Sequence, residues 1–178
     1  SGRDTPKESP WALLRESQSA ALALPFTAQA VTIDIGDPRD IHPANKQDVA
    51  HRLALAARRI AYGETQAQAA PAFDRVEFVG GEARVRFDHG HALAVRDGGS
   101  RVGGFVLAGA DRRFHAAQAT LVDGIVVVRS PQVAEPHAVR YGWRDNPDDA
   151  DLVGTNLVGA DIAGRGQSPV APFRSDVW

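Results

Sequence analysis

His42 lies close behind two aspartates in a short, proline-punctuated segment. Asp37 and Asp40 precede it by five and two residues, and Pro38 and Pro43 frame the stretch. An imidazole titrates near neutral pH and can accept or donate a proton, and a neighbouring carboxylate can orient its ring. The residue types therefore indicate acid–base chemistry at His42, with a purely structural loop histidine as the alternative.

The segments on either side of this loop predict one strand and two helices. Residues 30–35 form a run that is apolar except at Thr32 and Asp34, which predicts a strand. Residues 9–24 before it and 45–63 after it carry apolar side chains at helical spacing. A strand that runs into a loop and then into a helix is where open α/β sheets place their chemistry.

One strand between two helices is not a sheet. Strands that are apolar on both faces belong to parallel sheets covered by helices, and residues 9–63 predict no neighbouring strand to pair with. We therefore expect the missing strands to come from the upstream part of the same precursor. That part would be either a second chain cut from one precursor or a piece removed in handling.

After a linker of small residues (64–71), the apolar positions alternate with a period of two. Gly80-Gly81 and Asp123-Gly124 predict tight hairpin turns between short strands. Tyr141 and Trp143 alternate on one of these strands and are expected in the core. Strands at this spacing predict a β-sandwich of roughly 80–110 residues.

The chain thus predicts two parts. Residues 1–65 are expected to be the C-terminal part of an α/β domain, holding its last strand and helices. Residues 66–178 are expected to be an all-β sandwich, and the last thirty or so residues, rich in Gly, Asp and Pro, predict an extended tail.

Four runs of this chain resemble the sialate O-acetylesterase family, whose members are serine esterases of the SGNH (GDSL-like) hydrolase type. Residues 34–47 (DIGDPRDIHPANKQ) are similar to the last catalytic block of that family. Residues 11–18 (WALLRESQ) resemble its helix before that strand. Residues 139–147 (VRYGWRDNP) and 171–176 (APFRSD) resemble its closing segments. The likeness runs in order over most of the chain and covers only the C-terminal portion of the family.

The resemblance implies that His42 is the catalytic base of a carbohydrate O-acetylesterase. Many SGNH enzymes place an aspartate three residues before this histidine, and here that position is Arg39. The orienting group is therefore Asp40 or Asp37, or else a main-chain carbonyl or a water. Asp40 is preferred because it is nearest in sequence. Asp34 is expected to be a structural acid.

The nucleophile that the family implies has no convincing match in this chain. The family's serine lies in a Gly-Gln-Ser-Asn-like segment, and here Gly166-Gln167-Ser168 precedes a proline in the tail, which indicates a chance match. We expect ester hydrolysis only together with an N-terminal fragment or chain that carries the serine. The resemblance implies an acetylated sugar as substrate and no cofactor, and no metal site is predicted.

Composition limits the other classes of function. The net charge of −2 gives no electrostatic reason to expect nucleic acid or a membrane surface as partner, and no run of about 18 apolar residues predicts a membrane span. The chain has no cysteine, so the residues do not indicate a compartment; the resemblance implies a periplasmic or secreted protein. Two other functions stay open: an acetylxylan-type esterase acting on plant glycans, and a non-catalytic carbohydrate-binding β-sandwich.

Overall fold

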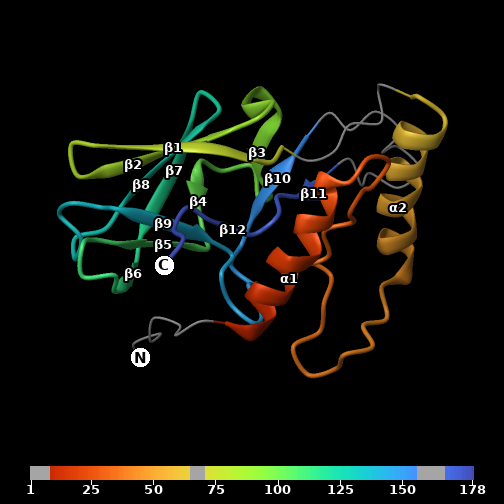
Figure 1. Ribbon diagram of the computed structural model, residues 1–178, viewed down its shortest axis with the longest axis horizontal. Helices are drawn as coiled ribbons and strands as arrows, with labels where there is room; N and C mark the ends of the chain where they lie inside the picture. The colour runs from red at the N-terminus through yellow and green to blue at the C-terminus, as the bar shows by residue number, and fades with distance from the viewer. Residues whose placement is uncertain (1–8, 65–70, 156–166) are drawn as a thin grey trace.

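The computed structural model describes residues 9–64, 71–155 and 167–178. Its larger part is a set of antiparallel sheets, and two helices lie side by side at one end of them (Figure 1). A long loop joins the two helices and projects beyond them. No helix among the described residues is long and apolar enough to cross a membrane.

Both α-helices lie in the first third of the chain, and the strands follow them, with one 3-10 turn between β2 and β3. The helical elements are α1 (Pro10–Ala20), the short 3-10 turn η1 (Ala21–Ala23), α2 (Lys46–Ala61) and the 3-10 turn η2 (Gly90–Ala92). The strands are β1 (Phe73–Val79), β2 (Glu82–Phe87), β3 (Leu93–Val95), β4 (Arg101–Val102), β5 (Phe105–Ala108), β6 (Phe114–Ala116), β7 (Gln118–Val122), β8 (Ile125–Arg129), β9 (Ala138–Tyr141), β10 (Leu152–Gly154), β11 (Ser168–Pro169) and β12 (Phe173–Arg174).

The described strands form three sheets, with orders β1-β2-β8-β7-β4, β12-β9-β5-β6 and β11-β10-β3. Both hairpin turns that the sequence predicts are confirmed. Gly80 and Gly81 join β1 to β2, and Asp123 and Gly124 join β7 to β8. All four residues have positive φ, which the type I′ turn requires and which glycine adopts at little cost.

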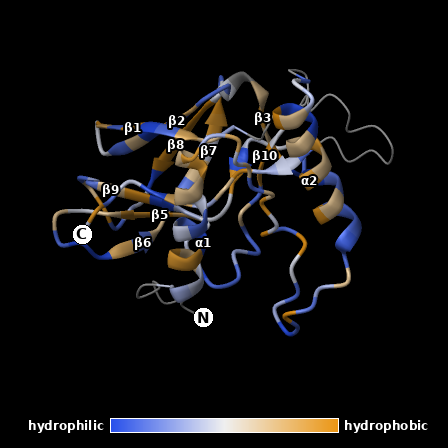
Figure 2. Cartoon of the chain, turned by 45° about the vertical axis from the view of Figure 1, so that its right-hand side comes forward, coloured by the Kyte–Doolittle hydropathy of each residue, from blue (hydrophilic) through white to orange (hydrophobic). Residues whose placement is uncertain are grey.

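The hydrophobic core lies between the five-stranded and four-stranded sheets. Val85, Val126 and Val128 from the first sheet pack in one cluster with Leu107, Val139 and Tyr141 from the second. Apolar colour covers much of these strands and runs on to parts of α1 and α2 (Figure 2). Tyr141 and Trp143 are both buried, as the sequence predicts. The structure is therefore mostly β-sheet with two helices and is consistent with the expected β-sandwich.

The C-terminal segment is more than a tail. Its described parts contribute β10, β11 and β12, each paired antiparallel in a sheet. Leu152, Val170 and Phe173 are buried because their apolar side chains, although separated by Gly, Asp and Pro residues, all turn into the core. Phe173 packs among Phe73, Phe87 and Tyr141. Residues 156–166 lie outside the described part.

The predicted strand at residues 30–35 is not found in the structure. This run pairs with no strand among the described residues, and it ends in a turn in which the N–H of Ile35 donates to the carbonyl of Thr32. A strand needs a neighbouring strand to accept and donate its main-chain hydrogen bonds, and no strand among the described residues pairs with this run. The α/β portion of the prediction therefore has no sheet within the described residues.

Helix α1 is fixed to the sandwich by polar contacts at its N-terminus and along its middle. The hydroxyl of Ser9, which caps the helix, donates to the carboxylate of Asp145. Arg15 donates to the main-chain carbonyls of Arg144 and Asp145, and Arg174 of β12 donates to both oxygens of Glu16 at 2.8 and 2.9 Å. Three of the runs that carry the family resemblance thus meet at one place.

Candidate active site

The loop that carries His42 lies between η1 and α2 and projects beyond both helices (Figure 1). Asn45 ends it by capping α2, because its side-chain oxygen accepts the N–H of Asp48 at 3.1 Å. Within the loop, Asp37 and Asp40 form an isolated antiparallel bridge, and the N–H of Asp40 donates to the carbonyl of Asp37. This tight turn brings the two aspartates to its base and leads directly into His42.

Asp40 is the acid nearest to the imidazole. Its Oδ1 lies 3.3 Å from Nδ1 of His42 and also accepts the main-chain N–H of His42 at 2.8 Å. The second contact is an Asx turn, in which the aspartate side chain bonds to the backbone two residues on. The side chain of His42 is 81% exposed, so its other nitrogen, Nε2, is open to any group that approaches the loop.

Asp37 has a different set of contacts. Its Oδ1 accepts the N–H of Arg39 at 2.8 Å and lies 3.8 Å from Nε of the same residue. Asp37 thus forms the first of two successive Asx turns, and its contacts are with Arg39 and the turn to Asp40. Of the two acids named from the sequence, the structure brings Asp40 to His42.

Asp34 is a structural acid, as the sequence predicts. Arg52 of α2 binds both of its oxygens at 2.7 Å and also donates to the carbonyl of Val31 at 2.6 Å. The side chains of Arg52 and Asp34 are only 9% and 13% exposed. The sequence reasoning did not single out Arg52; a carboxylate in an otherwise apolar run was the signal that a cationic partner is needed. This pair anchors the start of the loop to α2.

A groove of about 420 Å³ runs along one side of the loop. Its walls come from α1, from the loop itself and from the segment that follows Trp143. Burial lowers the pKa of Arg15 in this wall, and the charge of Asp145 partly offsets that effect. The residues that line the groove are Trp11, Leu14, Arg15, Gln18, Thr32, Ile33, Gly36, Asp37, Pro38, Asp40, Ile41, Pro43, Asp145, Asn146 and Pro147.

The one Gly-Gln-Ser run of the chain does not meet His42. Ser168 begins β11 and lines a separate cavity of about 160 Å³ between η1, α2 and β11, and His42 is not among the residues that line it. Gly166 lies outside the described residues. Among the residues lining the groove beside the His42 loop, Thr32 alone carries a hydroxyl.

Within residues 9–64, 71–155 and 167–178, no group of three or more His, Cys, Asp or Glu side chains is placed to hold a metal ion. The loop therefore offers an exposed imidazole with a carboxylate on one nitrogen. This arrangement can accept a proton from a hydroxyl that another segment brings to Nε2.

Comparison with solved structures gives an informative likeness. No family model matches the chain, and no curated protein matches it. A crystal structure described as that of a novel carbohydrate acetylesterase from Xanthomonas citri is similar to it, with 56% sequence identity and a TM-score of 0.85. The similarity covers 97% of this chain and 38% of that one. The chain is thus similar over nearly its whole length to a little over one third of a carbohydrate acetylesterase.

Proposed function

We propose that this chain is the C-terminal portion of a serine carbohydrate O-acetylesterase and that His42 is its general base. The observation that carries the proposal is the 56% identity to part of a carbohydrate acetylesterase, which supports a carboxylic ester hydrolase that acts on an acetylated sugar. The contact between Asp40 and Nδ1 of His42 supports the role of the histidine, and it favours Asp40 over Asp37 as the orienting acid.

In this mechanism the serine comes from an upstream part of the protein. Nε2 of His42 takes the proton of that serine as its oxygen attacks the acetyl carbonyl, and the imidazolium returns the proton to the leaving sugar oxygen. Water then hydrolyses the acyl-enzyme by the same proton transfers in reverse order. Asp40 holds Nδ1–H and stabilises the imidazolium. No cofactor takes part.

The exposed apolar side chains of the first third of the chain support the upstream partner. Helix α1 buries only Ala12 and α2 buries only Leu55 against the described residues, although both are amphipathic. Large apolar side chains on these helices and the loop remain exposed: Trp11, Leu14, Leu22, Leu24, Phe26, Ile41, Leu53 and Tyr62. An apolar surface of this extent is what the remaining strands of an SGNH-type α/β domain would cover.

The test is the substitution His42→Ala in the complete protein, assayed on an aryl acetate. Removal of a triad base lowers kcat on the order of 10⁴-fold or more, and the same loss is expected here. His115→Ala is the matched control, because His115 lies on β6 of the sandwich; its turnover should equal that of the unaltered protein. Unchanged turnover in His42→Ala would refute the proposal.

The finer assignment that we propose is an activity like that of sialate O-acetylesterase. The runs at 34–47 and 11–18 support it. An acetylxylan-type esterase is the alternative, with the same chemistry and a different pocket. Parallel assays on O-acetylated sialic acid and on acetylated xylan distinguish the two, since only the true substrate should give a high kcat/KM.

A further inference from the structure

The outer face of the five-stranded sheet carries an excess of positive charge. The strand register places residues of neighbouring strands in rows across this face, for example Glu77, Arg84, Val127, Thr120 and Arg101. The alternation of buried and exposed positions on β2, β7 and β8 confirms which residues point outward. Five arginines lie on this face, namely Arg75, Arg84, Arg86, Arg101 and Arg129, against Glu77, Glu82 and the neighbouring Asp74, which pairs with Arg75.

A buried carboxylate fixes two of these arginines. Glu82 is 4% exposed, and its two oxygens accept from different residues: Oε1 from Nε of Arg84 at 2.6 Å, and Oε2 from Nε of Arg129 at 2.7 Å and also from Nη2 of Arg129. Among the described residues Arg84 bonds through Nε alone, and its side chain is 49% exposed. Its terminal amino groups are therefore held in place and remain open to a ligand.

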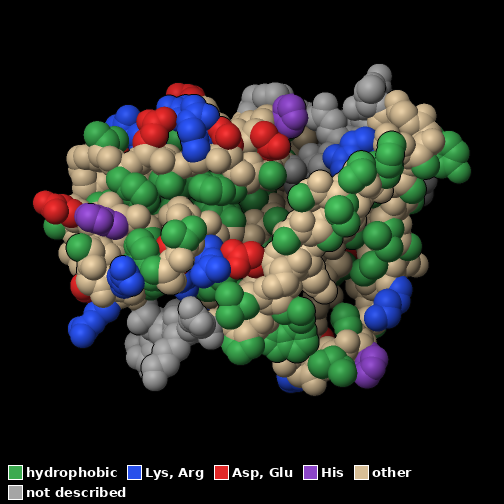
Figure 3. Space-filling model, in the orientation of Figure 1, with side chains coloured by type: hydrophobic (Ala, Val, Ile, Leu, Met, Phe, Trp, Pro, Cys, Tyr) green, Lys and Arg blue, Asp and Glu red, His purple; other side chains and the backbone are tan. Residues whose placement is uncertain are grey.

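The outer face of the sheet has a depression beside Arg84 and Arg129. This depression of about 440 Å³ is lined by Glu82, Arg84, Gln118, Thr120, Arg129 and two valines. Gln118 and Thr120 offer uncharged hydrogen-bonding groups next to the guanidinium groups. Charged side chains of both signs gather over β1 and β2 (Figure 3).

We propose that this face binds a glycan that carries carboxylate groups on its sugars. A guanidinium held at Nε presents a planar pair of donors that matches a carboxylate, and Gln118 and Thr120 can bond the neighbouring hydroxyls of a sugar ring. The choice of a glycan rests on the proposed function of the chain. The sugar carboxylate could come from a uronate or from a sialate.

A nucleic acid fits this face less well. Phosphate recognition uses a positively charged track along the backbone, frequently with aromatic side chains on which bases stack. Glu77 and Glu82 interrupt the arginines here, and no aromatic residue lines the depression. Carboxylates that are spaced along a sugar chain can each pair with a separate guanidinium group on this face.

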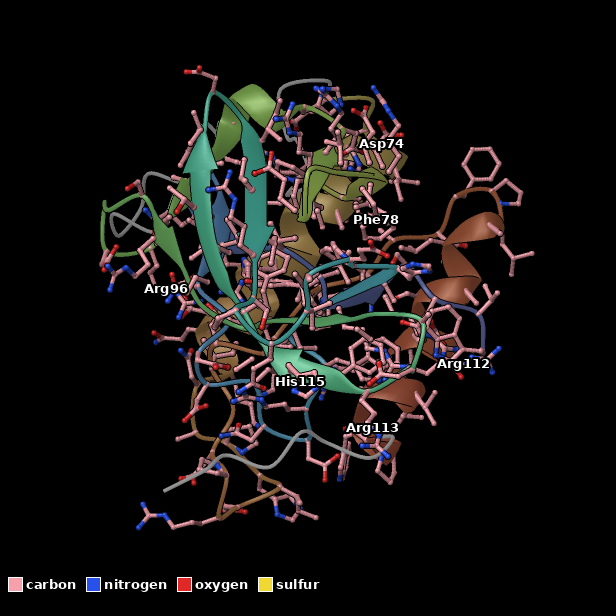
Figure 4. The ribbon with its side chains drawn as sticks, turned by 90° about the vertical axis from the view of Figure 1, so that its left-hand side faces the viewer. Asp74, Phe78, Arg96, Arg112, Arg113 and His115 are labelled. Atoms are coloured by element: carbon pink, nitrogen blue, oxygen red, sulfur yellow. The ribbon has the colours of Figure 1, made fainter. Side chains whose placement is uncertain are left out.

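The experiment measures the affinity of the complete protein for polygalacturonate, for polysialic acid, for unacetylated neutral xylan and for duplex DNA at physiological salt. The test variant is Arg84→Gln/Arg129→Gln. The control variant is Arg112→Gln/Arg113→Gln, which removes the same charge at the β5–β6 turn, away from Asp74 and Phe78 of β1 (Figure 4). We expect one of the two acidic glycans to bind, at least tenfold weaker binding in the test variant, and unchanged binding in the control.

A second variant keeps the test decisive if the first one unfolds. Arg84→Lys/Arg129→Lys retains the charge and loses the planar fork, so affinity should fall several-fold. The acidic glycan that binds shows whether the recognised carboxylate belongs to a uronate or to a sialate. Binding of neither, equal binding of the neutral xylan, tighter binding of duplex DNA, equal losses in test and control variants, or full affinity in the lysine variant would each overturn the proposal.

The outcome is separable from the esterase test. The glycans carry no acetyl ester, so binding is measured without turnover, and Arg84→Gln/Arg129→Gln should leave hydrolysis of an aryl acetate unchanged. A protein that fails the His42→Ala test can still bind these glycans, and the reverse also holds.

Discussion

Asp40 has two contacts with the same residue, one to the backbone and one to the ring. Its carboxylate accepts the N–H of His42 and lies beside Nδ1, so it fixes both the path of the loop and the direction of the imidazole. Asp37 shapes the preceding turn through Arg39, whereas Asp40 is the acid beside the His42 ring. The two acids therefore have separable roles.

Substitution of each acid should separate these roles. Asp40→Asn in the complete protein leaves an amide beside Nδ1, which favours the wrong tautomer, and kcat should fall on the order of 10³–10⁴-fold. Asp37→Asn keeps the turn-forming side-chain oxygen, so a loss below roughly tenfold is expected. Steady-state kinetics on an aryl acetate measure both. A larger loss in Asp37→Asn would assign the orienting role to Asp37.

Tyr141 illustrates a residue with a structural role only. Its ring is fully buried, and its hydroxyl oxygen accepts the main-chain N–H of Leu152 at 2.9 Å. Burial raises the pKa of the Tyr141 hydroxyl well above its ordinary value, so the group stays neutral. The bond joins β9 to β10.

Tyr141→Phe should lower the free energy of unfolding by about 1–3 kcal/mol, because it leaves the N–H of Leu152 buried without an acceptor. Urea denaturation measures the change. Tyr62→Phe is the control, since Tyr62 is exposed at the end of α2 and its variant should unfold at the same urea concentration as the unaltered protein. Equal stability of both variants would mean that the Leu152 N–H finds another partner.

At the scale of elements, the sequence predicts correctly those features that depend only on the residues at the spot, such as tight turns. The turns at Gly80-Gly81 and Asp123-Gly124 need positive φ, and the residues themselves supply it. Residues 30–35 show the limit of this reasoning. Their apolar pattern is that of a buried strand, but a strand exists only where a neighbour pairs with it. β11 and β12 were missed because two-residue strands carry no periodicity that a sequence can show.

At the candidate site, residue types make His42, Asp40 and Asp37 candidates, and the geometry of two successive Asx turns was not predictable from them. Arg52 was missed for a different reason. Its role depends on the packing of α2 against residues 31–34, a contact across 18 positions of the chain that has no local signature.

Glu82 links strands β2 and β8 through charge, and this contact makes part of the stability depend on pH. Hydrogen bonds from Arg84, and then from Arg129, lower the pKa of Glu82 below its ordinary value of 4.5. Because the folded state holds the ionised form more tightly than the unfolded state does, this stabilisation is complete above the unfolded-state pKa. It is lost as the pH falls through the lower folded-state value.

The free energy of unfolding of the unaltered protein should therefore fall more steeply below about pH 4.5 than that of Glu82→Gln. Urea titrations at a series of pH values between about 6 and 3 measure both curves. Parallel curves over this range would show that the contacts of Glu82 with Arg84 and Arg129 do not contribute.

At the scale of the whole molecule, apolar side chains are distributed unevenly. The sandwich encloses its own core, whereas α1, α2 and the loop between them expose most of theirs. The upstream part of the esterase that we propose would cover these side chains. The exposed side chains of the helices should therefore matter in the complete protein and not in the 178-residue chain alone.

Leu53→Asp tests this difference. Leu53 on α2 is 51% exposed, so the variant should leave the melting temperature of the 178-residue chain unchanged. In the complete protein the Leu53→Asp variant should lower the melting temperature, by roughly 2–4 °C for each kcal/mol of lost burial. Val79→Asp, equally exposed at the end of β1, is the control and should change neither. If the complete protein melts at the same temperature with and without Leu53→Asp, no upstream segment covers Leu53 of α2.

The contacts of α1 have a consequence for the order in which the protein is made. A ribosome delivers Glu16 long before Arg174, which follows it by 158 residues, whereas Asp145 emerges earlier and can already receive Ser9 and Arg15. The first helix can thus contact the sandwich through Ser9 and Arg15 before Arg174 of β12 is available to Glu16. In this interval α1 is held through Ser9 and Arg15, and the ion pair between Glu16 and Arg174 forms only after β12 has emerged.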